Sequence, residues 1–460
     1  MKRAVGPLDK RKRVSRCKAC AKRQIKCQGG VPCEYCQRTK KICTPQAVSS
    51  ATASTTFNVK FVKYTPPQQS ILEAATLPLQ IQTHSNDLYL SSFAASLLRC
   101  QFTPDFTDIA QDLLPLMQTS PPLRNLAIAL GALDASRRSS IRSFEQKESP
   151  QCVAYRSYNR SLQSLQQRLQ TSDAAVCEDV AWSTFLLGLF ELMSESSGEG
   201  WAKHMFYGTS KVLQLAGPDA YASSLQRRLL NAFRVLEANR TIMFGDATFL
   251  SESKWRVYNS INHETAETPD FTASITELMI QTSAFSKRLF EQIESIPEEE
   301  RLFSPTITAL AHEGTELDRK ISNWCDSVSL PPDPTDHFIQ LALAKYHAVR
   351  LFHCRNFSYY TCWHPGTIPQ LDQKEIDACV AAIVDLCDKI LQSSNIPGAI
   401  LLFPLRMAGA HSNFEWQRDK VRNLLNQIHN SGFVVAERIQ IDLLEFWEFQ
   451  DDQDNIQPGV

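Results

Sequence analysis

Six of the fourteen cysteines lie within the first 43 residues, and their thiols are candidate metal ligands. Their spacing is a Cys-x2-Cys-x6-Cys unit written twice, with five residues between the two copies. The first histidine of the chain is His84, so no imidazole is close enough in sequence to complete a local site. Zinc favours sulfur ligands in closed structural sites, so this pattern indicates a zinc centre. The six candidate ligands are Cys17, Cys20, Cys27, Cys33, Cys36 and Cys43.

Counting ligands favours two Zn²⁺ ions over one. A structural zinc takes four ligands, so a single ion would leave two of the six thiols unused. Two ions need eight coordination positions from six thiolates, which requires two bridging sulfurs. Cys17 and Cys33 occupy equivalent places in the two copies, and we expect them to be the bridges. The expected ligand sets are Cys17, Cys20, Cys27 and Cys33 for one ion, and Cys17, Cys33, Cys36 and Cys43 for the other.

Three other readings of the cysteines stay open at this stage. A ribbon with a single zinc ion would use four of the thiols. Disulfides are disfavoured because nothing in the sequence directs the chain to an oxidising compartment. A redox Cys-x-x-Cys pair would need a βαβ context, which the sequence lacks. So short a segment buries little core, so metal binding would supply most of its folding free energy, on the order of 10 kcal/mol per zinc.

Charge divides the chain into a basic head and an acidic body. Residues 1–43 hold 14 Lys or Arg and two acids, which gives a net charge of +12. Since the whole chain has a net charge of −1, the other 417 residues have a net charge of −13. Two Zn²⁺ ions and six thiolates would lower the head only to about +10. This balance indicates a module that binds a polyanion. The run Lys10–Arg13 is of the nuclear-localisation type, and no apolar segment is long enough to be a secretory signal or a membrane span.

The cysteine segment resembles the fungal binuclear zinc cluster family of transcription factors, closely so over residues 15–45. Lys26 before the third cysteine and Pro32 before the fourth also fit that family's pattern. The resemblance implies a short helix after each Cys-x2-Cys pair, the first of which enters the major groove of double-stranded DNA and reads CGG-type triplets. The family usually has a lysine where this chain has Gln24, and glutamine pairs best with adenine. We therefore expect G/C-rich half-sites that are relaxed or altered.

Basic side chains surround the cysteines, and each has an expected place on DNA. Lys22, Arg23 and Lys26 follow the first cysteine pair and can reach phosphates or guanine edges. Residues of the second copy would contact backbone phosphates, and the arm before Cys17 would follow the phosphates or lie in the minor groove. A solvated basic face is the alternative. The expected DNA-binding residues are Arg11, Lys12, Arg13, Arg16, Lys18, Lys22, Arg23, Gln24, Lys26, Arg38, Lys40 and Lys41.

The rest of the chain predicts one large all-α domain. Apolar residues recur at helical spacing near residues 152–170, 177–193, 201–215, 222–243, 270–293, 337–353, 374–391 and 434–447. Glycine and proline clusters separate these stretches, and no set of alternating strands is evident. The predicted organisation is a basic arm (1–16), a Zn₂Cys₆ DNA-binding domain (17–43), a flexible linker (44–85), an all-α regulatory domain of packed helical hairpins (86–447) and an acidic tail (448–460).

The helical body resembles the fungal-specific regulatory domain that often follows such clusters, and the resemblance implies regulation and interaction without catalysis. The residues that carry it are Glu191, Trp201, His204, Gly208, Gly217-Pro218, Phe233-Arg234, Glu237, Arg240, Phe249-Leu250 and Trp255. We interpret His204 as a packing residue rather than a base. Residues 353–364 contain two His and two Cys whose spacing fits no zinc template. The segment Asp442–Asp452 alternates acids with large apolar residues, and is either the last core helix or an activation segment that binds a coactivator.

These features predict a nuclear, zinc-dependent, sequence-specific DNA-binding transcription factor rather than an enzyme. The family resemblance implies a target in transcription by RNA polymerase II, such as a metabolic or secondary-metabolite gene cluster. The alternative is a corepressor or interaction scaffold in which the zinc cluster is structural. An enzyme ranks third, since no catalytic motif is evident. No heptad run follows the cysteines, so the sequence leaves monomer and homodimer open.

Overall fold

Helices form all the regular secondary structure in the described part of the chain, which contains no strand. The computed structural model describes residues 36–37, 43, 80–138, 148–221, 223–255, 270–327 and 335–456. The chain divides into two compact units, one of residues 5–78 and one of residues 1–4 with 79–460. The second unit contains the helical body, and its architecture confirms the all-α prediction for that part of the chain.

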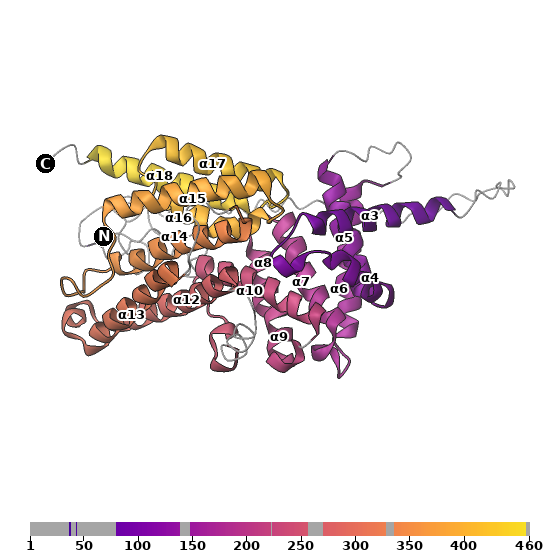
Figure 1. The fold of residues 1–460 in the computed structure, drawn as a ribbon, viewed down its shortest axis with the longest axis horizontal. Coiled ribbons are helices and arrows are strands. Elements are labelled where there is room, and N and C mark those ends of the chain that lie inside the picture. The colour runs from indigo at the N-terminus through magenta and orange to yellow at the C-terminus, as the bar shows by residue number, and fades with distance from the viewer. Residues whose placement is uncertain are drawn as a thin grey trace. The chain divides into compact units, whose positions relative to one another are not determined.

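The body begins with helices that pack around α7 (Figure 1). Within this group α5 packs against both α3 and α6, and α7 lies against α5. Helices α8 and α9 are joined by a single π-helical stretch, η3, so residues 199–216 run as one helical segment. The bounds are α3 (Gln80–Leu98), η1 (Pro104–Phe106), α4 (Ile109–Thr119), α5 (Pro121–Arg138), α6 (Pro150–Arg168), η2 (Ala174–Val176), α7 (Glu178–Ser194), α8 (Glu199–Lys203), η3 (His204–Thr209) and α9 (Ser210–Ala216).

The long helix α10 connects this first group to a second one that extends to the end of the described chain (Figure 1). Helix α10 packs against α7 on one side and α12 on the other, and α14 packs against α12, α15 and α16. The bounds are η4 (Pro218–Tyr221), α10 (Ser224–Phe244), η5 (Phe249–Ser251), α12 (Phe271–Ser295), η6 (Glu298–Phe303), α13 (Pro305–Ser327), α14 (His337–Ser358), α15 (Gln373–Ser393), η7 (Gly398–Leu401), α16 (Leu402–Ala410), α17 (Glu415–Asn430) and α18 (Ala436–Ile456).

Local sequence explains where several of these helices begin and end. Helix α15 starts with a capping box, in which the Asp372 carboxylate accepts from the Glu375 amide (2.8 Å) and the Glu375 carboxylate accepts from the Asp372 amide (3.0 Å). Helix α10 ends at Gly245, whose φ of 68° is a left-handed conformation that glycine adopts without strain. The first boundary is therefore set by two capping side chains, and the second by the backbone freedom of a glycine.

Two helices approach each other closely at Gly131 of α5. A Cβ atom there would lie 1.8 Å from the carbonyl oxygen of Tyr89 on α3. Only hydrogen fits between these two backbones, which explains a glycine in the middle of a helix despite its unfavourable propensity. Helix α3 thereby sits directly against α5, and Tyr89 and Phe93 are both buried at this contact.

Helix α6 forms within the stretch 152–170, where the sequence predicts a helix, but its large apolar residues do not all lie on the buried face. Leu165 is buried, whereas Tyr155 and Leu169 are exposed. The face toward α5 is instead made of small residues, and Ser161 donates a hydrogen bond to the Pro122 carbonyl (2.8 Å). Small side chains let the two helices approach closely, so the bulky tyrosines lie beside this contact and not within it. There Tyr155 and Tyr158 pack against Phe190 of α7.

The last helix, α18, packs its apolar side into the body. Leu443 and Trp447 are buried, and the Trp447 indole donates to the Gly409 carbonyl (2.8 Å). Asp451 forms an ion pair with Arg418 of α17 at 2.8 Å. The segment 442–452 is thus part of a helix that contributes to the core.

The ionisable side chain of Lys345, on α14, is buried in the protein core without a hydrogen-bond partner among the described residues. Lys345 is fully buried, and burial lowers the pKa of its ammonium from the ordinary value of 10.5 to about 7, with the charge of Asp270 acting in the opposite direction. Unfolding would return this amine to water, where it is protonated up to a pH near 10. Lys345 therefore destabilises the native state at neutral pH.

We expect Lys345→Met to raise the free energy of unfolding by about 2 kcal/mol at pH 7. Between pH 7 and 10 the unfolded chain binds a proton at this residue that the native state lacks, so wild-type stability should rise with pH in that window. The gain from the substitution should therefore shrink toward pH 10. Urea unfolding at several pH values measures this, with the exposed Lys320→Met as control. An equal effect of the two substitutions would contradict the expectation.

Candidate functional site

The predicted zinc ligands lie mostly outside the described residues. Cys36 and Cys43 are described, and Cys36 is buried in a helical turn while Cys43 is half-buried. The other predicted ligands and DNA contacts fall outside the described ranges. These residues are Cys17, Cys20, Cys27, Cys33, Arg11, Lys12, Arg13, Arg16, Lys18, Lys22, Arg23, Gln24, Lys26, Arg38, Lys40 and Lys41.

A buried ion cluster occupies the centre of α10. Arg240 is completely buried and donates two hydrogen bonds to the Glu237 carboxylate, at 2.8 and 2.9 Å. A third donation reaches Asp246 at 2.9 Å, just beyond the end of the helix. Burial alone would lower the pKa of Arg240, but the hydrogen bonds and charges of both carboxylates raise it above its ordinary value. The guanidinium is therefore held in the charged form, and its pairing with Glu237 is a structural link rather than a reactive group.

An aromatic cluster packs against the same helix. Phe233 stacks on Phe249 with ring centroids 5.9 Å apart, and Phe249 packs edge-on against Trp255 at 4.9 Å. Phe233 and Trp255 are fully buried. Together with Glu237 and Arg240, these residues carried the family resemblance in the body. In the structure, these residues pack against one another around α10.

His204 also serves a structural role, at the start of the π-helical stretch. Its Nδ1 lies 3.5 Å from the Glu191 carboxylate, which in turn accepts a hydrogen bond from Tyr158. Burial lowers the pKa of His204, while the charge of Glu191 opposes that shift. Three helical elements, α6, α7 and η3, meet at this cluster. The arrangement agrees with the interpretation of His204 as a packing residue.

The histidines and cysteines near residues 353–364 do not converge. His353 is fully buried, its Nε2 lies 2.9 Å from the Gly314 carbonyl, and its ring packs against Phe285 and Phe357. His364 is exposed. Within the described residues, no group of three or more His, Cys, Asp or Glu side chains has a geometry that could hold a metal ion.

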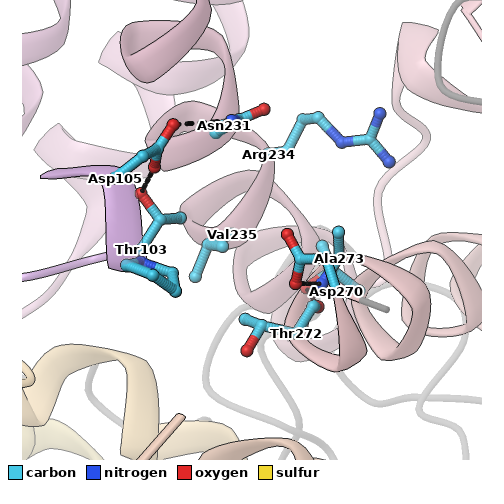
Figure 2. A pocket seen from close by; sticks show the side chains of 10 residues that line it. Thr103, Asp105, Asn231, Arg234, Val235, Asp270, Thr272 and Ala273 are labelled. Carbon is cyan, nitrogen blue, oxygen red and sulfur yellow. Dashed lines mark hydrogen bonds between the residues drawn. The ribbon is translucent and has the colours of Figure 1, made fainter. Parts of the chain in front are cut away.

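A cavity of about 180 Å³ opens where η1, α10 and the start of α12 meet. Figure 2 shows Asp105 and Asp270 on either side of Val235. Thr103, Thr272 and Thr276 contribute buried walls, whereas the two carboxylates are on exposed residues at its edge. This site could not be predicted from the sequence, because its residues are spread from position 103 to 276 and belong to three separate elements.

Hydrogen bonds link several polar groups of the cavity wall to one another. The Asp105 carboxylate accepts from the Thr103 hydroxyl (2.5 Å) and from the Asn231 amide (3.0 Å), as the dashed lines in Figure 2 mark. The Asp270 carboxylate accepts from the Ala273 amide (2.8 Å) and caps α12. Arg234 extends away from Asp270, and its guanidinium pairs with Glu277 at 3.1 Å. The cavity thus presents oxygen acceptors and negative charge.

Comparison with known proteins decides the family of the body. Residues 87–457 match the family described as the fungal specific transcription factor domain, and the match spans almost the whole described body from α3 to α18. This chain is a member of that family.

A fungal specific transcription factor domain explains several features of the body. The family is one of transcription factors and not of enzymes, which agrees with the lack of a catalytic motif in the sequence. The matched range includes the Glu237–Arg240 pair and the cavity beside Val235. The cysteine segment of residues 17–43 lies outside the matched residues, so the match concerns the helical body of the chain. None of the described helices is both long and apolar enough to span a bilayer.

One relative carries little functional information about this fungal transcription factor domain. An uncharacterised protein, AN5342, of Emericella nidulans is 31% identical over 108 residues. The aligned stretch is 23% of this chain and 23% of that protein, so it spans less than a quarter of either. No solved structure matches the chain.

Proposed function

We propose that this chain is a nuclear, zinc-dependent transcription factor that binds specific DNA sequences and regulates transcription by RNA polymerase II. One observation carries the proposal, namely that a doubled Cys-x2-Cys-x6-Cys unit with a charge of +12 precedes a fungal transcription factor domain on the same chain. A metal-binding basic head would supply recognition of DNA, and the helical body would supply regulation.

The donor set of the head fits two zinc ions. Six thiols stand within 27 residues of one another, with no histidine among them. Zinc accepts four thiolate ligands in structural sites, and bridging by Cys17 and Cys33 would complete both coordination spheres. Bound zinc supplies the cross-links that such a short segment needs to fold. The chemistry of the head is therefore structural, and recognition falls to its side chains.

Residues 21–26 would form the reading element of the head. Lys22, Arg23 and Lys26 provide charges for phosphates and for guanine edges, since phosphate contacts position a protein and base contacts specify the sequence. Gln24 offers both a donor and an acceptor, the combination that matches adenine N7 and N6. We therefore propose a half-site in which one guanine of a CGG-type triplet is relaxed or replaced.

The proposal is tested by selecting binding sites from random duplex DNA with the full-length protein. The expected result is an enriched motif with one or two short G/C-rich half-sites. Gln24→Lys is a matched variant, because it changes one side chain of the reading element and leaves all cysteines in place. We expect it to shift the selected motif toward guanine at a single position, with each changed base pair worth about 1–3 kcal/mol.

Two results would contradict the proposal, one of them sequence-specific recognition itself and the other the role of Gln24. Binding to all duplexes with equal affinity would favour the scaffold or corepressor alternative, in which the cluster is structural. An identical motif for the wild type and Gln24→Lys would mean that residue 24 does not face the bases. The spacing of paired half-sites in the enriched sequences would also distinguish a monomer from a homodimer.

A further inference from the structure

The cavity between η1, α10 and α12 has the composition of a binding site for a small positively charged molecule. Its walls come from parts of the chain that are far apart in sequence, and Asp105 and Asp270 contribute two negative charges. Neither carboxylate forms an ion pair with a described residue; their partners are the neutral Thr103, Asn231 and Ala273 groups. Both carboxylates are therefore available to a ligand with cationic donors.

Cations of the protein that lie nearby do not cancel this charge. The guanidinium of Arg234, which lines the cavity, is paired with Glu277. Lys345 on α14 feels the charge of Asp270, but burial lowers its pKa to about 7, so it is mostly neutral at pH 8. No ion pair within the described residues therefore offsets the carboxylates of Asp105 and Asp270.

The hydrogen-bonding capacity of the walls points to the same class of ligand. The hydroxyls of Thr272 and Thr276 donate to the carbonyls of Phe338 (3.4 Å) and Thr272 (2.6 Å). Their oxygens keep lone pairs, as do the carboxylates, so what remains for a ligand is mainly acceptor capacity. A metal ion is a poorer fit, because the described residues hold no convergent group of three His, Cys, Asp or Glu side chains.

We propose that this cavity binds a small organic molecule with primary ammonium groups, held between Asp105 and Asp270. Since η1 belongs to the first helical group and α12 to the second, a bound ligand would connect the two groups across α10. A role for the ligand in controlling transcription rests on the function proposed above. Binding of the ligand itself does not.

Calorimetric titration of the full-length protein at pH 8 tests the proposal with three probes of the same length. Pentane-1,5-diamine carries two ammonium groups, pentane-1,5-diol is neutral, and glutarate carries two carboxylates. We expect saturable binding of one diamine per chain, with at least tenfold weaker binding of the diol and glutarate. The diamine should also raise the melting temperature, because a ligand that binds only the native state stabilises it.

Isosteric variants separate binding from folding. Asp105→Asn and Asp270→Asn remove one charge each. Asparagine keeps an acceptor oxygen at position 105 and can still cap α12 at position 270, so we expect normal folding and at least tenfold weaker diamine binding. Asp372→Asn is the matched control, because it removes the same charge from the N-cap of α15 and should leave binding unchanged.

Failure of this proposal would be distinct from failure of the proposed function. Absence of saturable diamine binding, equal binding of the diol or glutarate, or unchanged binding by both cavity variants would each overturn it. The selection of DNA sites uses the head of the chain and a different readout, so its outcome does not depend on these titrations.

Discussion

Replacing Cys17 with serine is expected to abolish selective DNA binding by the full-length protein, with a loss of at least 100-fold in affinity for the selected site. As a proposed bridge between both ions, Cys17 would contribute to two coordination spheres, so its loss should weaken both. Since zinc supplies most of the folding free energy of such a segment, the head would unfold. Metal analysis should find two zinc ions per wild-type chain and fewer in the variant, and fluorescence anisotropy measures the binding.

The control for this experiment is Cys152→Ser, which changes an exposed cysteine at the start of α6. It should retain both zinc ions and full affinity. Removal of zinc with a chelator should reproduce the effect of Cys17→Ser on the wild type, and added zinc should reverse it. A wild-type stoichiometry of one zinc ion or none would overturn the binuclear proposal, whatever the affinity of the variant.

Arg240→Met is expected to lower the free energy of unfolding of the helical body by about 3–5 kcal/mol. The substitution leaves Glu237 buried without a counter-charge, because its carboxylate accepts two hydrogen bonds from Arg240. Urea unfolding followed by circular dichroism measures this loss of stability.

A surface ion pair gives the matched control. Arg288 and Glu313 are both about half exposed, and Arg288→Met should cost less than 1 kcal/mol. The double variant Arg240→Met with Glu237→Leu should recover part of the lost stability, because no unpaired charge remains in the core. If Arg240→Met were no more costly than Arg288→Met, the buried pair would not hold α10 in place.

The helical class of the body was predictable because apolar residues recur at helical spacing. The stretch 374–391 predicted α15, which runs from Gln373 to Ser393, and the capping pair at its start fits known rules. The buried face of α6 was not predictable from the spacing of its large apolar residues alone. Its position depends on how closely α5 approaches, and this is decided by small residues such as Ser161. The packing of α6 against α5 therefore decides which of its side chains are buried, and the size of those side chains does not.

The candidate sites differ in how far sequence could locate them. The cysteine unit is local, so its ligands are visible from spacing within one short segment. The cavity is formed by Asp105, Asn231 and Asp270, which come together only when η1, α10 and α12 pack. No periodicity or motif links these positions. Similarly, Glu237 and Arg240 were recognised through a family pattern, whereas their role as a buried pair follows only from three-dimensional burial.

The two faces of α18 determine how a transactivation assay of the C-terminus should be designed. Cutting the chain before residue 441 would remove Leu443 and Trp447 from the core, so a silent reporter would register a misfolded protein. Leu444 and Phe449 are more than a third exposed and lie among acidic residues on the solvent side. Polar substitutions at those two positions would examine recruitment of the transcription machinery while sparing the hydrophobic interior.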